Sequence, residues 1–394
     1  MSQRLIVVIG MHRSGTSAVT KALSYIGVHL GDDFIDLMPE VNAKGFWEDA
    51  SLNRLNISIL TRLKSDWLTN QSLNYNLLHG SNFRELVALA KEILLNRLED
   101  CPQFAFKDPR TTILLPFWKT VISEVGCESS YVIAFRHPLE VAGSLRQRNG
   151  FEFVKSLILW LRYNYLAVTD TEGCSRVFVD FIDLLQSPEE QLKRLANELL
   201  LAAPTGSALA EFSEQFISTD LRRNIAGDID LNDIEAGKYP VTLAMEFYDA
   251  LKQLCGGPTA SSYNGLALIV SKVGDYLNSV ESLLQYLDTL EYATAKGSAC
   301  LKNDEFPWIN TFRSSFNVAD EVTNIQIDCV HSPEIGNVGI DKRAEIAGGD
   351  NVPQDNCALS ATAEGGTIST LLSSARGFVR RFSSRTMPRM GSKR

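Results

Sequence analysis

The sequence predicts an α/β protein with a mostly parallel central sheet, followed by a C-terminal helical or coiled-coil segment and a disordered tail. Three observations carry this prediction. Short apolar runs alternate with helical periodicity up to about Leu254, which is typical of repeated strand-helix units. An apolar repeat with alternating gaps of three and four residues follows. Polar residues with little periodicity then dominate from about Thr294.

Four apolar runs are predicted to be strands of the sheet: Leu5 to Ile9, Phe104 to Phe106, Tyr131 to Phe135 and Val177 to Val179. Segments with helical spacing lie between and after them: Thr16 to Tyr25, Ser51 to Leu63, Phe83 to Leu98, Thr112 to Ser123, Leu139 to Gln147, Phe151 to Ala167 and Pro188 to Leu199. We therefore expect a first domain over residues 1–255, an amphipathic helix or coiled coil over 262–292 and a largely disordered region over 293–394.

Composition limits the class of protein. The 394 residues are 45% hydrophobic and 22% charged, as in ordinary soluble domains, and the net charge of −9 argues against a chain that binds nucleic acid along its length. The seven cysteines include no CxxC pair, so they predict neither a zinc site nor a disulfide framework and suit a reducing compartment. No apolar run approaches the roughly 18 residues of a spanning helix. We expect a cytoplasmic protein.

The segment after Gly256-Gly257-Pro258 has its own pattern. Its apolar positions are Leu266, Ile269, Val273, Tyr276, Val280, Leu283, Leu287 and Leu290. This seam over 266–290 predicts a coiled coil, formed either with a second copy of the chain in a homo-oligomer or with a helix of another partner. The alternative is one amphipathic helix that folds back on the core. Beyond Gly365 the tail holds seven basic residues and no Asp or Glu. It could lie on an anionic membrane surface, but we favour a solvated tail.

A phosphate-binding loop follows the first strand. The segment Gly10-Met11-His12-Arg13-Ser14-Gly15-Thr16-Ser17 leads directly into a helix, so backbone N–H groups and a helix N-terminus converge on one anion site. The G-x4-G spacing is that of a Walker A loop, yet Thr16 stands where the loop's lysine belongs. The cation of this loop is Arg13 instead. We therefore expect a three-layer P-loop fold in which Arg13, rather than a Walker lysine, is the cation of the phosphate-binding loop.

The stretch His12 to Ser17 resembles the 5′-phosphosulfate loop of sulfotransferases that use 3′-phosphoadenosine 5′-phosphosulfate (PAPS). It is closest to the bacterial branch, although His12 replaces the family's usual Pro. The resemblance covers about residues 1–255. It implies that PAPS is the co-substrate, with no metal, and that the loop binds it through Arg13, Ser14, Gly15, Thr16 and Ser17.

A second motif matches the same family. Its members recognise the 3′-phosphate with an Arg at a strand end and a Ser eight residues later, and Arg136 and Ser144 have this spacing. Pro138 suits the first turn of the intervening helix. The late Gly-rich loop of the cytosolic small-molecule branch is not found. Arg222 and Arg223 offer cations in its place, or form a solvated basic patch.

Sulfuryl transfer needs cations on the transferred group and a base for the acceptor hydroxyl. Arg13 is the first catalytic cation. Lys107, in Lys107-Asp108-Pro109 at a strand end, resembles the lysine that supports the leaving group in protein-tyrosine sulfotransferases. Alternatively, Asp108 caps the next helix while Lys107 and Arg110 are solvated.

The predicted base is Glu48, which follows Phe46-Trp47. Aromatic neighbours raise the pKa of a carboxylate and exclude water, as a general base requires. Asp49 and His29 are the alternatives, and Glu48 could instead be a charge at a helix N-terminus. The tryptophans are assigned no role.

The expected activity is therefore transfer of a sulfuryl group from PAPS to a hydroxyl of a carbohydrate or other small acceptor. Two rival functions are a nucleotide kinase, which the missing Walker lysine disfavours, and a non-catalytic nucleotide-binding scaffold, which Arg13, Lys107 and Arg136 disfavour.

Overall fold

The computed structural model describes residues 3–36, 44–78, 80–217, 238–256 and 259–295. The predicted tail from residue 296 onward and the basic pair Arg222 and Arg223 lie outside these ranges.

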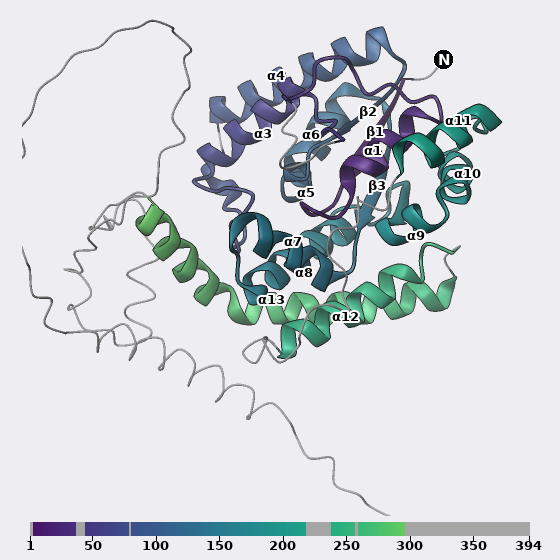
Figure 1. The fold of residues 1–394 in the computed structure, drawn as a ribbon. Coiled ribbons are helices and arrows are strands. Elements are labelled where there is room, and N and C mark those ends of the chain that lie inside the picture. Colours follow the sequence, from purple (N-terminus) through teal and green to yellow (C-terminus); the bar gives the residue numbers. More distant parts are fainter. Residues whose placement is uncertain (1–2, 37–43, 79, 218–237, 257–258, 296–394) are drawn as a thin grey trace, which may run out of the picture. The chain divides into compact units, whose positions relative to one another are not determined.

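A parallel sheet forms the centre of the described residues (Figure 1). Its strands lie in the order β2-β1-β3-β4, and all neighbouring pairs are parallel. Their bounds are Arg4–Ile9 (β1), Gln103–Lys107 (β2), Glu128–Phe135 (β3) and Arg176–Asp180 (β4). The prediction of an α/β fold with a mostly parallel sheet is confirmed. The chain runs from β1 to β2 on one side and then to β3 on the other, which creates a switch point at the carboxyl edge of β1.

Helices cover both faces of the sheet, because successive side chains of a strand point to opposite faces. In β1, Leu5, Val7 and Ile9 join one hydrophobic cluster, whereas Ile6 and Val8 join another. The second cluster is covered by α1 (Thr16–Ser24), α9 (Phe181–Gln186), α10 (Pro188–Glu198), α11 (Gly206–Glu211) and the π-helical turn η2 (Phe212–Phe216). The first is covered by α3 (Ala50–Arg62), the 3₁₀ turn η1 (Tyr75–Leu77), α4 (Gly80–Asp100), α5 (Arg110–Ile113), α6 (Leu115–Val125), α7 (Pro138–Asn149), α8 (Phe153–Thr169), α12 (Lys238–Lys252) and α13 (Ala260–Ala295).

The helix predicted over Thr112 to Ser123 is in fact two helices. The chain bends at Leu114, which has φ −103° and ψ 12°, between α5 and α6. Pro116 explains the break, because it has no N–H to continue the hydrogen-bond ladder and suits the first turn of a new helix.

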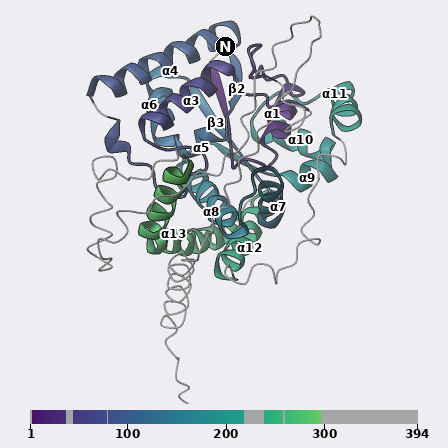
Figure 2. The ribbon, with the colours of Figure 1, turned by 60° about the vertical axis from the view of Figure 1, so that its left-hand side comes forward.

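Helix α13 packs against the chain's own core. Leu266, Ile269, Val273, Leu277 and Leu284 are buried in the same cluster as the sheet. Figure 2 shows α13 beside α12 and α8, in agreement with their residue contacts. The first part of the predicted seam therefore faces inward, as in the folded-back alternative, and oligomerisation through 266–290 stays a prediction.

The end of the seam departs from this pattern. Leu287 and Leu290 are exposed. A straight helix rotates by about 20° per heptad relative to a 3.5-residue repeat, so residues late in the seam turn away from the contact. Gly274 lies under Tyr165 of α8, whose hydroxyl would be 3.0 Å from a Cβ at that position. The glycine thus permits close packing of the two helices.

Two carboxylates of α13 bind the loop that precedes η1. Asp288 accepts hydrogen bonds from the backbone N–H groups of Asn70 and Gln71, both at 2.8 Å, and from the Asn70 side chain at 2.9 Å. Glu281 accepts from the Ser72 N–H at 2.7 Å and pairs with buried Arg162 at 2.8 Å. The loop over residues 66–74 is therefore fixed by a helix about 200 residues later.

No helix within the described ranges is both long and apolar enough to cross a membrane.

If α13 belongs to the core, Leu277→Ala should lower the free energy of unfolding by about 2 to 5 kcal/mol, because it leaves a cavity at a buried site. Leu268→Ala on the same helix is the control. Leu268 is 64% exposed, so its substitution should change stability by less than about 0.5 kcal/mol. Urea denaturation measures both, and equal small effects would show that α13 does not contribute to the core.

Candidate functional site

The loop after β1 depends on two close approaches. Gly10 has φ +144°, and a Cβ there would lie 2.1 Å from the Ala134 carbonyl oxygen of β3. Gly15 has φ +80°, and a Cβ there would lie 2.1 Å from the ring of Phe181. The spacing of the two glycines is therefore imposed by the packing of the loop on β3 and α9.

The N-terminus of α1 fits an anion. Gly15 is its N-cap residue and provides no side chain to accept from the first N–H groups. The hydroxyl of Ser14 is buried and has no hydrogen-bond partner among the described residues. Backbone donors and an unused hydroxyl at one helix N-terminus are suited to a phosphate or sulfate group. Thr16 is buried in the first turn.

The predicted nucleotide residues come close together, but in a different pairing from the one expected. Arg13, with φ +70°, donates from Nε to the Ser144 hydroxyl at 2.8 Å. Arg136 is buried at the end of β3, donates from Nε to Glu140 at 2.9 Å and lies 5.0 Å from the Phe181 ring centroid. Ser144 therefore bonds the loop cation, and Arg136 has a carboxylate partner in the first turn of α7, the helix that follows it.

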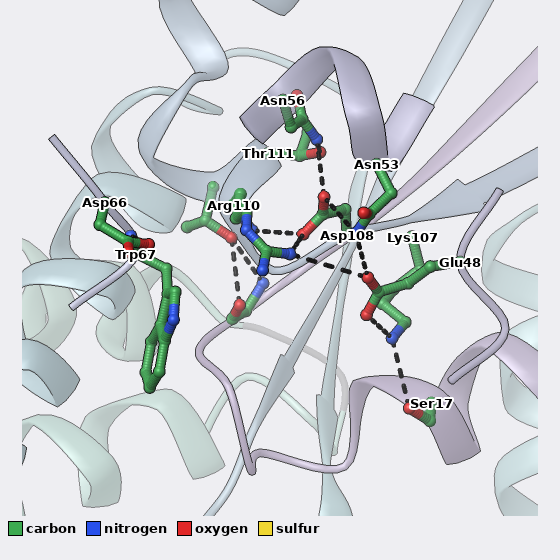
Figure 3. Close-up of polar contacts among 12 residues, drawn as sticks. Ser17, Glu48, Asn53, Asn56, Asp66, Trp67, Lys107, Asp108, Arg110 and Thr111 are labelled. Carbon is green, nitrogen blue, oxygen red and sulfur yellow. Dashed lines mark hydrogen bonds and ion pairs between the residues drawn. The ribbon is translucent and has the colours of Figure 1, made fainter. Parts of the chain in front are cut away.

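A buried ion pair joins three segments of the chain at the carboxyl edge of the sheet (Figure 3). Lys107 at the end of β2 donates from Nζ to Glu48 at 2.7 Å and to the Ser17 hydroxyl at 3.3 Å. Ser17 in turn donates to the Phe46 carbonyl at 3.2 Å. The structure thus brings together the predicted cation, the predicted base and the phosphate loop.

Glu48 has both carboxylate oxygens engaged. Oε1 accepts from Lys107, and Oε2 accepts from Asn53 at 2.7 Å with Arg110 Nη1 at 3.8 Å. Burial raises the pKa of Glu48 and the neighbouring Asp108 raises it further, while Lys107 and Arg110 act in the opposite direction. The net effect is a carboxylate whose affinity for a proton exceeds that of an exposed glutamate.

Asp108 is the centre of a polar network under this pair. It accepts from the Arg110 backbone N–H at 2.9 Å and its guanidinium at 3.1 Å, and from Asn56 at 3.0 Å and Asn53 at 3.3 Å. The first contact reaches the first N–H of α5, but the N-cap residue of that helix is Pro109, so Asp108 is not its cap, although the sequence allowed that alternative. Arg110, considered solvated in the same alternative, is instead largely buried, with 17% of its side chain exposed.

Sequence reasoning missed Asn53, Asn56 and Arg110. A signal for the first two existed, because two asparagines three residues apart lie on the face of α3 that also buries Leu52, Leu55 and Ile59. Amides on such a face require partners, and here they orient Glu48 and Asp108.

The alternative bases are held in other roles. Asp49 is the N-cap of α3, where it accepts from the Ser51 and Leu52 N–H groups, and its second oxygen accepts from Arg97 at 2.8 Å. His29 has an exposed side chain, and its backbone extends the ladder of β2. Among the described residues, neither the Asp49 side chain nor the His29 side chain forms a hydrogen bond or ion pair with Lys107.

Two aromatic rings lie close to His12 of the phosphate loop. The His12 ring is 4.3 Å from that of Trp67 and 6.2 Å from that of Tyr163, measured between centroids. Burial lowers the pKa of His12 well below its ordinary value, and four nearby cations lower it further, so the imidazole is neutral. By contrast, Trp118 and Trp160 are fully buried in the core.

Comparison with solved structures gives distant matches, among them two sulfotransferase domains. The sulfotransferase domain from the Synechococcus PCC 7002 olefin synthase has 14% identity and a TM-score of 0.35, with 69% of this chain and 95% of that domain covered. The sulfotransferase domain from the curacin biosynthetic pathway has 13% identity and a TM-score of 0.34, with 70% and 98% covered. At these TM-scores the likeness identifies neither a family nor an activity. No family profile matches the sequence. No curated protein matches it either.

The capping role of Asp49 predicts that Asp49→Ala lowers the free energy of unfolding by about 1 to 3 kcal/mol, because it removes the N-cap bonds and leaves Arg97 unpaired. Asp33→Ala is the matched control. Its ion pair with Arg54 is exposed and 4.0 Å long, so the loss should stay below about 0.5 kcal/mol. Denaturant unfolding of both variants checks this, and an Asp49 effect as small as that at Asp33 would contradict it.

Proposed function

We propose that this chain is a PAPS-dependent sulfotransferase that transfers a sulfuryl group to a hydroxyl of a carbohydrate or other small acceptor. The observation that carries the proposal is the buried Lys107–Glu48 pair beside a phosphate loop whose cation is Arg13 and which lacks the Walker lysine. A cation and a base next to an anion site are the two groups that this transfer requires.

The residues present fit the nucleotide. The N-terminus of α1, with the Ser14 hydroxyl and Arg13, would hold the 5′-phosphosulfate. Arg136 and Ser144 would hold the 3′-phosphate that distinguishes PAPS from ATP. The Ser144 hydroxyl accepts from Arg13 and can still donate its own proton to a phosphate oxygen, and a phosphate would add a second charge-assisted acceptor for the Arg136 guanidinium beside Glu140.

The proposed reaction is an in-line displacement. The bond between sulfur and the bridging oxygen of PAPS breaks, a new bond forms between sulfur and the acceptor hydroxyl oxygen, and the acceptor proton passes to Glu48. The products are a sulfate ester and 3′-phosphoadenosine 5′-phosphate (PAP). Lys107 and Arg13 stabilise the negative charge that develops on the bridging and sulfuryl oxygens.

The ion pair suggests how the base is released. Glu48 Oε1 is occupied by Lys107, so the oxygen becomes available only when the ammonium group turns to another anion. Charge developing on the bridging oxygen supplies that anion at the moment a base is needed. Asn53 keeps the opposite oxygen of Glu48 in place during the exchange.

The first test concerns the 3′-phosphate. Replacing both members of the pair, Arg136→Met with Glu140→Leu, avoids leaving a buried carboxylate unpaired. PAP binding should weaken by about 2 to 5 kcal/mol while binding of adenosine 5′-monophosphate, which lacks the 3′-phosphate, stays nearly unchanged. Calorimetric titration measures both affinities.

The control is the same double change at Arg194 and Glu198, a second ion pair with i,i+4 spacing, on α10. It should leave the affinity for PAP unaffected. In the parent protein, PAP should raise the melting temperature more than ADP or GDP does. Stronger binding of ADP would favour the kinase alternative, and equal losses of the two adenosine nucleotides would remove the Arg136 assignment.

The second test concerns the base. Glu48→Gln keeps the size of the side chain but removes its basicity, so single-turnover transfer from radiolabelled PAPS to pooled hydroxyl acceptors should fall by about 10² to 10⁴. Affinity for PAP should stay within a few-fold. Glu124→Gln, an exposed carboxylate on α6, is the control and should leave the rate unchanged.

The pH dependence follows from the same residue. Catalysis needs Glu48 unprotonated, and its pKa is raised, so the rate should fall with decreasing pH at a midpoint above the ordinary value of a glutamate. Glu48→Gln should abolish this acid limb. An unchanged limb in the variant, or a rate within threefold of the parent, would move the role to another group.

A further inference from the structure

Arg148 is a cation for which the described residues provide no carboxylate partner. It lies on α7 one turn beyond Ser144, and its guanidinium carbon is 5.3 Å from the Trp67 ring centroid. Its Nε donates to the neighbouring Asn149 side chain at 2.7 Å. Among the described residues, no Asp or Glu lies within ion-pair distance of it. Arg148 therefore has a hydrogen bond and a ring contact, but no carboxylate of the described residues neutralises its positive charge.

Two neighbouring cations have carboxylate partners. Lys107 pairs with Glu48, and Arg110 pairs with Asp108 and Glu48. Arg148 is half-buried, and both its burial and the charge of Arg110 lower its pKa. A desolvated arginine beside a second arginine is unfavourable in the free protein, and an added anion would relieve it.

Aromatic rings provide a surface next to this charge. Trp67 contacts His12 at 4.3 Å and stacks on Phe151 at 5.9 Å, both between ring centroids. The neutral His12 has a buried Nε2 with no partner among the described residues. Rings that lie beside a cation and an unused polar atom are suited to a ligand with one apolar face and one acid group.

The backbone that carries Trp67 is held by two contacts. Tyr163 of α8 donates to the Trp67 carbonyl at 2.8 Å, and Asp288 of α13 binds the following residues Asn70 and Gln71. An aromatic side chain on a fixed backbone loses less conformational freedom when a ligand binds than one on a mobile loop.

We propose, on the basis of the function proposed above, that Arg148 binds an acid group of the acceptor against the Trp67 ring. The acceptor is accordingly a hydroxyl compound that also carries an oxyanion such as a carboxylate. Arg13 and Lys107 serve the transferred group, and Arg148 serves the acceptor.

The experiment compares two acceptors that differ only in charge, 4-nitrophenyl β-D-glucuronide and its neutral glucuronamide, with PAPS as donor. The parent protein should prefer the glucuronide by at least about tenfold in kcat/KM, and Arg148→Gln should reduce that preference to about twofold or less. Arg148→Lys should retain part of it. Arg146→Gln removes an exposed cation from the same helix and should leave it unchanged.

Binding of the two glycosides to the PAP-loaded protein, measured by saturation-transfer NMR, gives a readout that does not need turnover. Equal binding of both, or a glucuronide preference that persists in Arg148→Gln, overturns the proposal. A loss of PAP affinity in Arg148→Gln would overturn it too, because Arg148 would then belong to the nucleotide site. Failure of the parent protein to bind PAP would instead refute the sulfotransferase function itself.

Discussion

The buried ion pair between Lys107 and Glu48 is the contact on which the carboxyl edge of this sheet depends. It joins the end of β2 to the segment before α3, and through Ser17 it reaches α1. Removing two charges from water is unfavourable unless further hydrogen bonds compensate, and Asn53 and Ser17 supply them. The neighbouring Asp108 network, which orients Asn53, therefore supports the pair as much as the two residues themselves do.

The strands could be predicted because parallel strands buried on both faces are continuous apolar runs, and all four runs lie within observed strands. Helix ends were harder to predict, as Pro116 shows by dividing one predicted helix into α5 and α6. The apolar repeat of α13 identified a helix, but a repeat alone does not distinguish a contact within the chain from a contact between chains.

The residues of the candidate site could likewise be predicted only in part. Glu48 and Lys107 could be found because each lies in a short motif with chemical meaning, and the structure brings them into contact. Asn53 was missed although its place on the apolar face of α3 was a signal, and the contact of Arg110 with Glu48 joins two segments that only the folded chain brings together. Asp49 shows the limit of residue type as a guide. It is adjacent to Glu48 and has the same chemistry, yet it is the N-cap of a helix.

The dependence of the Trp67 loop on α13 has a consequence for the order in which the protein is made. The sheet and the phosphate loop are complete once β4 has been synthesised, whereas Asn70 acquires its partner Asp288 only 218 residues after itself. Domains generally fold as units during synthesis, N-terminal ones first. Because α13 packs in the same hydrophobic cluster as the sheet, the loop that carries Trp67 cannot take its final shape until α13 itself has left the ribosome.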